Sequence, residues 1–384
     1  MIFYTSILCI SGIFMIISGI TNIGAIKNIF ASIVIILLAL LSGTRYHLGG
    51  YDYSNYEYMF QLAPTLNHLN LVNYVQQNGL IGSDVGWTFI NSTIKSMGFN
   101  FYGLTVFVAI FFWFTLYFVL KKYMTNINIF IVIAVYKYLL DVSFIYMRQS
   151  VAVAIFALSL RYILNKKIVP YMLLIIFAAT VHFSAVILIP IYWINRIKIT
   201  QKRLLWYTML FAFSFILVFL HVDVISMFGF FSNIVSGSGA QKISEASNGT
   251  LYGEVGILSS ILHFIEFLIV DFFLIKNFNK LKLNDEKQLL MIRLFMLLLP
   301  IYSVFATSPI MVRYGFYFLF TYPVIIDYLI VKISIINKIF WYSLLVFVSF
   351  VGMYKFVIGF DNGADFYYDS FIFHNESIRS NSNE

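Results

Sequence analysis

Reactive side chains concentrate in one segment of the sequence, Arg45-Tyr46-His47-Leu48-Gly49-Gly50-Tyr51-Asp52-Tyr53-Ser54-Asn55-Tyr56, directly after a strongly apolar run. Two adjacent glycines let the backbone bend freely, so we expect Arg45 and Asp52 to approach one another. A guanidinium binds phosphate oxygens, a carboxylate accepts protons, and Tyr53 and Tyr56 offer rings and hydroxyls of the kind that sugars use. The segment therefore predicts one wall of a site for an anionic, sugar-bearing lipid at a membrane surface.

Two more arginines lie inside or at the edge of apolar runs. Arg148 has apolar residues on both sides, and an arginine at mid-bilayer costs at least about 2.5–3.5 kcal/mol unless it has a partner or a wet cavity. Either it binds an anion, with Gln149 as a polar neighbour, or it forms an ion pair with Asp141, two turns away on a continuous helix. Arg313, followed by Tyr314, opens a later run at the outer interface, where it either binds an anion or snorkels to water.

The run 168–194 has basic residues at both ends, although its roughly 26 residues make only one full crossing. Either the positive-inside rule fails once here, or the run is a broken pair of half-helices that turns near Thr180-Val181-His182. We favour the broken pair, which places His182 beside a cavity, because irregular backbone at membrane depth is tolerated only inside protein or along a wet cavity. The alternative role for His182 is that of a hydrogen-bonded structural residue.

The composition requires that lipid solvate most of the chain. Of its 384 residues 61% are hydrophobic and 11% are charged, whereas soluble proteins average about 25% charged residues. With a mean hydropathy of +0.87, we predict an all-α, polytopic membrane protein of about 10–12 transmembrane helices, in which residues 1–384 form one integral membrane domain. The formal charge of +8 resides in short loops between apolar runs, which argues against nucleic-acid binding, and the single cysteine, Cys9, excludes an internal disulfide.

The short basic loops predict the topology, because Lys and Arg accumulate on the cytoplasmic side. These loops are 121–122, 161–167, 196–203, 276–287 and 332–338. Three longer segments remain for the far side, 45–100, 221–255 and the tail 358–384, and the same parity places the N-terminus there. Within 45–100, apolar residues at helical spacing after Asp84 predict an interfacial or re-entrant helix.

The sequence lacks the motifs of several enzyme classes. Its histidines show no metal-ligand spacing, and it contains no Asp-x-Asp pair, no Walker loop and no dinucleotide fingerprint. We therefore expect neither a metal nor a cofactor. The remaining inventory fits chemistry on a lipid-linked pyrophosphate, because arginines stabilise the departing charge while Asp52 or His182 takes a proton from an attacking sugar hydroxyl.

Five motifs, in order along residues 41–315, resemble those of the EpsG-like branch of the Wzy-type O-antigen and exopolysaccharide polymerases. They are the Arg45–Tyr56 segment, Asp84-Val85-Gly86-Trp87, Arg148-Gln149-Ser150-Val151-Ala152, His182-Phe183-Ser184-Ala185 and Arg313-Tyr314. Asp84 stands where the family more often has a glutamate.

This resemblance implies a GT-C-like glycosyltransferase in a bacterial inner membrane, with the active site, the loops 45–100 and 221–255 and the tail 358–384 facing the periplasm. It implies transfer of a growing undecaprenyl-pyrophosphate-linked glycan onto the non-reducing end of a lipid-linked repeat unit, with membrane lipid and a chain-length regulator as further partners. The implied catalytic residues are Asp52, His182 and Arg148, and the implied substrate-binding residues are Arg45, Tyr53, Tyr56, Gln149, Arg313 and Tyr314. Two alternatives stay open, a transporter or flippase of lipid-linked oligosaccharide and an O-antigen ligase.

Overall fold

The computed structural model describes residues 1–21, 24–72, 84–216, 220, 257–281, 285–306 and 308–380. These residues form helices joined by short turns, with no β-strand among them. The α-helices are α1 (Ile2–Ile20), α2 (Gly24–Gly43), α3 (Gly50–Leu62), α5 (Val85–Ser96), α6 (Phe101–Leu120), α7 (Asn128–Ala134), α8 (Met147–Leu164), α9 (Ile168–Val181), α10 (Gln201–Ser214), α13 (Ile257–Lys276), α14 (Glu286–Met296), α15 (Leu298–Ser303), α16 (Pro309–Arg313), α17 (Thr321–Ile330) and α18 (Ile335–Gly359). A π-helix, η2 (Val135–Ile145), is accompanied by the 3-10 helices η1 (Leu66–His68), η3 (Phe183–Arg196), η5 (Phe278–Lys280), η6 (Tyr314–Tyr317), η7 (Phe360–Phe366) and η8 (Phe371–His374). The predicted loop 221–255 lies outside the described residues.

Five helices in the described part of the chain are long and apolar enough to cross a membrane. They are α1, α6, α8, α18 and the continuous helix Asn128–Ile145 that α7 and η2 form together. Shorter apolar helices include α9, η3 and α17, so a passage through this bundle is often built from more than one helical piece. The prediction of an all-α, polytopic membrane protein is therefore confirmed.

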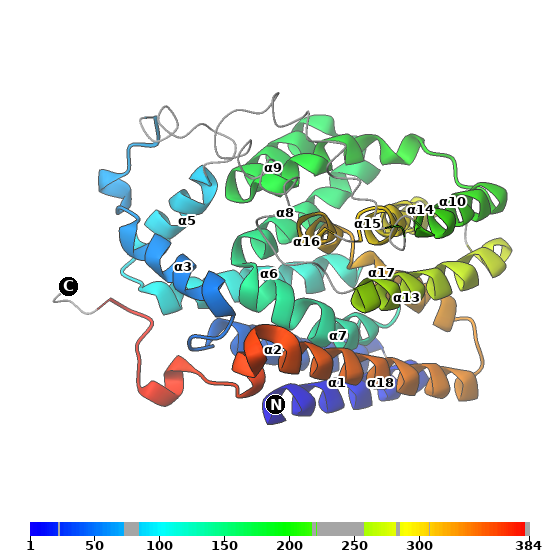
Figure 1. The fold of residues 1–384 in the computed structure, drawn as a ribbon, viewed down its shortest axis with the longest axis horizontal. Helices are drawn as coiled ribbons and strands as arrows, with labels where there is room; N and C mark the ends of the chain where they lie inside the picture. The colour runs from blue at the N-terminus through cyan, green and yellow to red at the C-terminus, as the bar shows by residue number, and fades with distance from the viewer. Residues whose placement is uncertain are drawn as a thin grey trace.

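The bundle has two distinct ends (Figure 1). The helices α3 and α5, the C-terminal tail and the N-terminus lie at one end, and α18 begins at the opposite end. The amine of Met1 donates to the carbonyl of Phe366 in η7, which fixes the N-terminus beside the tail. We call the end with α3 and α5 the site end, and the end where α18 begins, with Lys332 before the helix and Lys338 in its first turn, the basic end.

The centre of the bundle is the helix Asn128–Ile145, in which 94% of the residues are buried, whereas only 11% of the residues are buried in an 18-residue apolar stretch of α18, which turns most of its surface outward. Small residues bring α18 close to α1, since a Cβ at Gly12 would lie 2.7 Å from Val346 Cγ2. At the site end Asn100 Oδ1 accepts a hydrogen bond from the Gly103 N–H at 3.2 Å, which starts α6 shortly after α5. The buried centre therefore provides a fixed frame for the segments at the site end.

The run 168–194 is a broken pair of helices, as we favoured from the sequence. The helix α9 ends at Val181, His182 has an extended backbone with φ −148° and ψ 113°, and η3 follows. The two legs pack on each other, because Tyr171 OH donates to Leu188 O at 2.5 Å. Their 14 residues each correspond to about 21 Å for the α-helical leg and about 28 Å for the 3-10 leg. The chain thus turns at His182 and runs back, which explains why both ends of the run are basic.

Candidate functional site

A break in the central helix places Arg148 at the site end. The π-helix η2 ends at Ile145, Tyr146 has φ −100° and ψ 61°, and α8 begins at Met147. Stretches of π-helix are rare and often occur at functional sites. Because the first turn of an α-helix leaves N–H groups without intrahelical partners, the start of α8 adds positive potential beside Arg148.

The carboxylate that faces Arg148 belongs to Asp84, at the start of α5. Arg148 Nη1 and Asp84 Oδ2 form an ion pair, and the two side chains are 18% and 15% exposed. Arg148 Cζ also lies 5.5 Å from the centre of the Tyr56 ring. The alternative ion pair with Asp141 is wrong, because it required a continuous helix and the chain breaks at Tyr146.

Arg148 keeps hydrogen-bonding capacity beyond this ion pair. Its Nε is buried and has no hydrogen-bond partner within the part of the chain that the structure describes. A guanidinium presents five donors in a planar fork that suits carboxylate and phosphate oxygens. Arg148 is therefore equipped to bind an anion in addition to, or in exchange for, the carboxylate of Asp84.

Asp52 lies in the first turn of α3 and within electrostatic reach of Arg313 and Arg148. Burial raises the pKa of the Asp52 carboxyl above its ordinary value, and the two arginines act in the opposite direction. A carboxylate with a raised pKa is a better proton acceptor than an ordinary one. The sequence predicted Arg45 as the cation near Asp52, whereas in the structure Arg313 and Arg148 supply the positive charge there.

The second arginine, Arg313, is the last residue of α16 and lies beside the same break in the central helix. Arg313 Cζ lies 4.3 Å from the centre of the Tyr146 ring, and Asp141 is within electrostatic reach. Gln149 Nε2 donates to the backbone carbonyl of Arg313 at 2.7 Å, so Gln149 holds the main chain of this segment. Tyr314 is half-buried at the start of η6.

The turn at His182 lies against α5. A Cβ at Gly86 would lie 2.4 Å from Thr180 Oγ1, so α5 and the end of α9 are in direct contact and only glycine fits there. On the other side of the turn, the hydroxyls of Ser184 and Tyr317 are 2.8 Å apart and share a hydrogen bond. The half-buried His182 therefore lies between α5 and η6, the two elements that adjoin Asp84 and Arg313 in the chain.

Arg45 is a positioning residue with 1% of its surface exposed. Its Nε donates to Leu48 O at 3.1 Å, its Nη2 donates to Phe144 O at 3.0 Å, and its Nη1 donates to Ser42 O. Because Phe144 lies near the end of η2, Arg45 ties the loop before α3 to the helix break. Tyr53 is equally buried, and its hydroxyl donates to Arg45 O at 3.4 Å. Both side chains act on the site through the backbone that they hold, which differs from the direct substrate contact predicted from the sequence.

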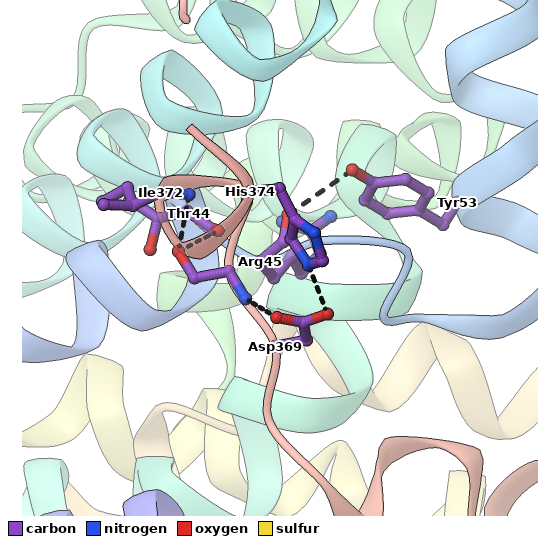
Figure 2. Close-up of polar contacts among 7 residues, drawn as sticks. Thr44, Arg45, Tyr53, Asp369, Ile372 and His374 are labelled. Carbon is purple, nitrogen blue, oxygen red and sulfur yellow. Dashed lines mark hydrogen bonds and ion pairs between the residues drawn. The ribbon is translucent and has the colours of Figure 1, made fainter. Parts of the chain in front are cut away.

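The C-terminal tail crosses the loop that contains Arg45, and Figure 2 shows Thr44, Asp369 and His374 meeting there. Ser370 Oγ donates to Thr44 O at 2.8 Å, and the Tyr46 N–H donates to Asp369 O at 3.1 Å. His374 Nε2 lies 2.8 Å from Asp369 Oδ2, and its ring stacks on that of Tyr46 at 4.2 Å. The hydrogen bond with His374 lowers the pKa of Asp369. We call residues 365–380 the tail strap, since they hold the loop from which α3 carries Asp52 into the site.

A charged cluster in the centre of the bundle was missed from the sequence. Lys137 Nζ and Glu266 Oε2 lie 2.8 Å apart, with side chains 4% and 17% exposed. Tyr136 OH donates to the same oxygen at 2.9 Å, and Lys137 is within electrostatic reach of Asp141. The signal was present, because Lys137 and Glu266 each interrupt an apolar run, and ionisable residues inside such runs are rare and usually functional.

The inward face of α5 carries three further polar groups, of which the sequence analysis named only Trp87, as part of a motif. Trp87 Nε1, Asn91 Oδ1 and Ser92 Oγ are buried and have no hydrogen-bond partner among the described residues. The Trp87 ring lies 5.7 Å from that of Tyr56, which faces Arg148. Buried polar groups without a hydrogen-bond partner are uncommon in native proteins. This face of α5 can therefore form further hydrogen bonds beside Arg148.

A model of the EpsG family matches residues 28–370, which include all five motifs that the fold brings to the site end. No curated protein and no solved structure matches the chain.

Proposed function

The chain belongs to the EpsG family, and on this premise we propose that it is a membrane glycosyltransferase that polymerises a polysaccharide without a metal ion. It transfers a growing undecaprenyl-pyrophosphate-linked glycan to the non-reducing end of a lipid-linked repeat unit, at the periplasmic face of a bacterial inner membrane. The observation that carries the proposal is the meeting of Asp52, Arg148 and Arg313, which are far apart in the sequence and within electrostatic reach in the fold.

The two arginines bind the pyrophosphate of the growing chain. Arg148 and Arg313 come from separate helices, and their guanidinium groups carry a permanent charge that suits phosphate oxygens. As the glycosidic bond to the carrier breaks, negative charge grows on the departing phosphate oxygen, and fixed cations stabilise that charge. Asp84 pairs with Arg148, so a phosphate must share or replace that carboxylate when it binds.

Asp52 takes the proton of the acceptor hydroxyl. The hydroxyl oxygen forms a bond to the anomeric carbon of the donor sugar, the bond from that carbon to the phosphate oxygen breaks, and the electron pair leaves with the pyrophosphate. The proton remains on the Asp52 carboxyl until water removes it. Burial raises the pKa of Asp52, and both arginines act on it, which favours Asp52 over His182 as the base.

The sugars of the acceptor lie over α3 and α5 in this proposal. Tyr56 faces Arg148, and its ring also contacts Trp87. The unsatisfied groups of Trp87 and Asn91 are suited to sugar hydroxyls, which act as donors and acceptors at once. Arg45 and Tyr53 fix the backbone of this wall, and Gln149 fixes that of the Arg313 segment.

The proposal is tested with the purified protein in lipid nanodiscs and a synthetic lipid-linked repeat unit. We expect products of two or more repeats and release of polyprenyl pyrophosphate. An Arg148→Lys variant keeps the charge and loses the planar fork, so we expect its rate to fall about 100-fold or more. Translocation of the substrate in liposomes without longer products would favour a flippase, and transfer only to a lipid A core would favour a ligase.

A further inference from the structure

A groove of about 360 Å³ lies between α13, α17 and α18. Its lining is mainly apolar, and all three helices contribute Ile269, Phe273, Ile326, Leu329, Leu345 and Val348. Because only four of the 25 residues of α18 are buried, this side of the bundle faces the membrane. The groove therefore opens to lipid.

The inner end of the groove is formed by Glu266, whose carboxylate already has partners. Oε2 accepts hydrogen bonds from Lys137 Nζ at 2.8 Å and from Tyr136 OH at 2.9 Å, and His263 Nδ1 lies 3.8 Å away. A carboxylate paired in this way does not require a polar group from an occupant. The rest of the wall is mostly hydrocarbon and aromatic carbon, which favours a hydrocarbon chain.

The other end of the groove lies at the basic end of the bundle and carries positive charge. Lys276 lines it with an exposed side chain. Lys338 precedes the groove residues Trp341 and Leu345 by three and seven positions, which places it on the same face of α18. Two lysines beside an indole ring are typical of a membrane interface that holds an anionic headgroup.

The length of the groove fits one leaflet of a bilayer. Glu266 and Lys276 are ten residues apart in α13, which corresponds to about 15 Å, or half of a hydrocarbon core of about 30 Å. We propose that the groove is a binding site for one anionic phospholipid of the leaflet at the basic end, with an acyl chain along the groove and the phosphate at Lys276 and Lys338. A carrier lipid whose pyrophosphate reaches Arg148 has its headgroup in the opposite leaflet, so the two sites are separate.

The bound phospholipid supports the centre of the bundle. Its acyl chain packs against α13, whose Glu266 holds Lys137 of η2, and Lys137 is within electrostatic reach of Asp141 near Arg313. Loss of the lipid is therefore expected to loosen α13 and to lower the melting temperature of the protein, without removing any residue of the sugar-transfer site.

Native mass spectrometry of the full-length protein tests this site. The protein is released from micelles that contain equal amounts of phosphatidylglycerol and phosphatidylcholine. We expect one phosphatidylglycerol to remain bound, with a preference over phosphatidylcholine that falls about 30-fold in Lys276→Ala/Lys338→Ala, since each lysine near an anionic surface contributes roughly a factor of five. The matched control, Lys198→Ala/Lys202→Ala, removes two exposed lysines of another basic loop and should leave the preference unchanged.

A second variant tests the acyl-chain part of the site. Leu345→Trp fills the groove and should abolish retention of the lipid, while the melting temperature in lipid-free detergent stays close to that of the unmodified protein. Equal retention of the two lipids, equal losses in the lysine variant and its control, or unchanged retention in Leu345→Trp would each overturn the proposal. Displacement of phosphatidylglycerol by undecaprenyl phosphate at equal concentration would overturn it as well, because the occupant would then be the carrier.

Discussion

The ion pair between Arg148 and Asp84 predicts in which direction the affinity for phosphate changes when the charge of Asp84 is removed. If the Asp84 carboxylate occupies the guanidinium that a phosphate uses, then Asp84→Asn removes a competitor and tightens phosphate binding. Asparagine has the same shape as aspartate and tolerates the left-handed backbone of this position, where φ is 54°. The variant therefore changes the charge while keeping the start of α5.

The magnitude follows from the burial of the pair. Side chains that are 18% and 15% exposed are partly screened by solvent, so we use the value of a hydrogen bond to a charged group, about 1.5–3 kcal/mol, rather than a full Coulomb energy. Because about 1.4 kcal/mol corresponds to a factor of ten in affinity, the variant should bind a prenyl pyrophosphate about 10- to 100-fold more tightly than the unmodified protein.

The assay is equilibrium binding of a short-chain prenyl pyrophosphate to protein in nanodiscs. Glu376→Gln serves as the control, because it also removes one negative charge from the site end and lies on an exposed part of the tail. If Asp84→Asn weakens binding, as loss of the arginine does, then Asp84 orients Arg148 and does not compete with phosphate. In that case the competition between the Asp84 carboxylate and phosphate for Arg148 would be wrong.

Three further predictions concern the support and protonation of the site. Burial raises the pKa of Asp52 above its ordinary value, so the base form of Asp52 becomes populated only as the pH rises through that raised pKa. We expect the acid limb of the rate profile there. Asp52→Asn should remove that limb, lower the rate about 100-fold or more and raise the melting temperature at neutral pH. Gly86→Ala adds a Cβ 2.4 Å from Thr180 Oγ1 at the end of α9, so we expect it to lose about 1–3 kcal/mol of stability and most of its activity. The control, Gly24→Ala, has open space around its Cβ and should keep both the stability and the activity of the unmodified protein. Thermal melting measures the stability, and polymer length measures the activity. The hydrogen bond with His374 lowers the pKa of Asp369, so the contribution of Asp369 to the tail strap is present at neutral pH and is lost as the pH falls through that pKa. We expect the protection factors of the tail amides, which compare their hydrogen exchange with that of an unfolded chain at the same pH, to fall at acid pH. Asp369→Asn should show the lower protection already at neutral pH.

The sequence predicted the membrane character and the broken pair at 168–194 because both depend on local composition. Apolar runs and basic loops can be read directly from the residue types. The basic residues at both ends of the run 168–194 place both ends on the same side of the membrane, which a single crossing helix cannot do. The break at Tyr146 was different, since no proline or glycine marks it and the π-helical turn before it depends on packing around η2. The ion pair weighed from the sequence as the alternative to anion binding by Arg148 was therefore one with its neighbour in sequence, Asp141, whereas the structure pairs Arg148 with Asp84.

The types of the residues in the candidate site could be read from the sequence, but the contacts that these residues make could not. The charge of Arg45 was visible, but whether its guanidinium faces a ligand or the carbonyls of Leu48 and Phe144 depends on how the tail strap closes over the loop. Contacts between residues 44–46 and 369–374 join the two ends of the chain, and no short-range pattern reports them. The buried ion pair of Lys137 and Glu266 was overlooked for another reason. Each of the two residues lies in a run whose other residues are mostly apolar, so the run was interpreted as an ordinary transmembrane helix.

The proposed function requires that Arg148 and Arg313 together bind a pyrophosphate. The direct measurement is the affinity of a prenyl pyrophosphate and of the matching uncharged prenol for Arg148→Ala and Arg313→Ala, with Arg161→Ala at the basic end as the control. We expect each of the first two variants to lose at least tenfold in pyrophosphate affinity, while their prenol binding and the affinities of the control variant stay unchanged. Equal pyrophosphate affinity in all three variants and the unmodified protein would contradict it.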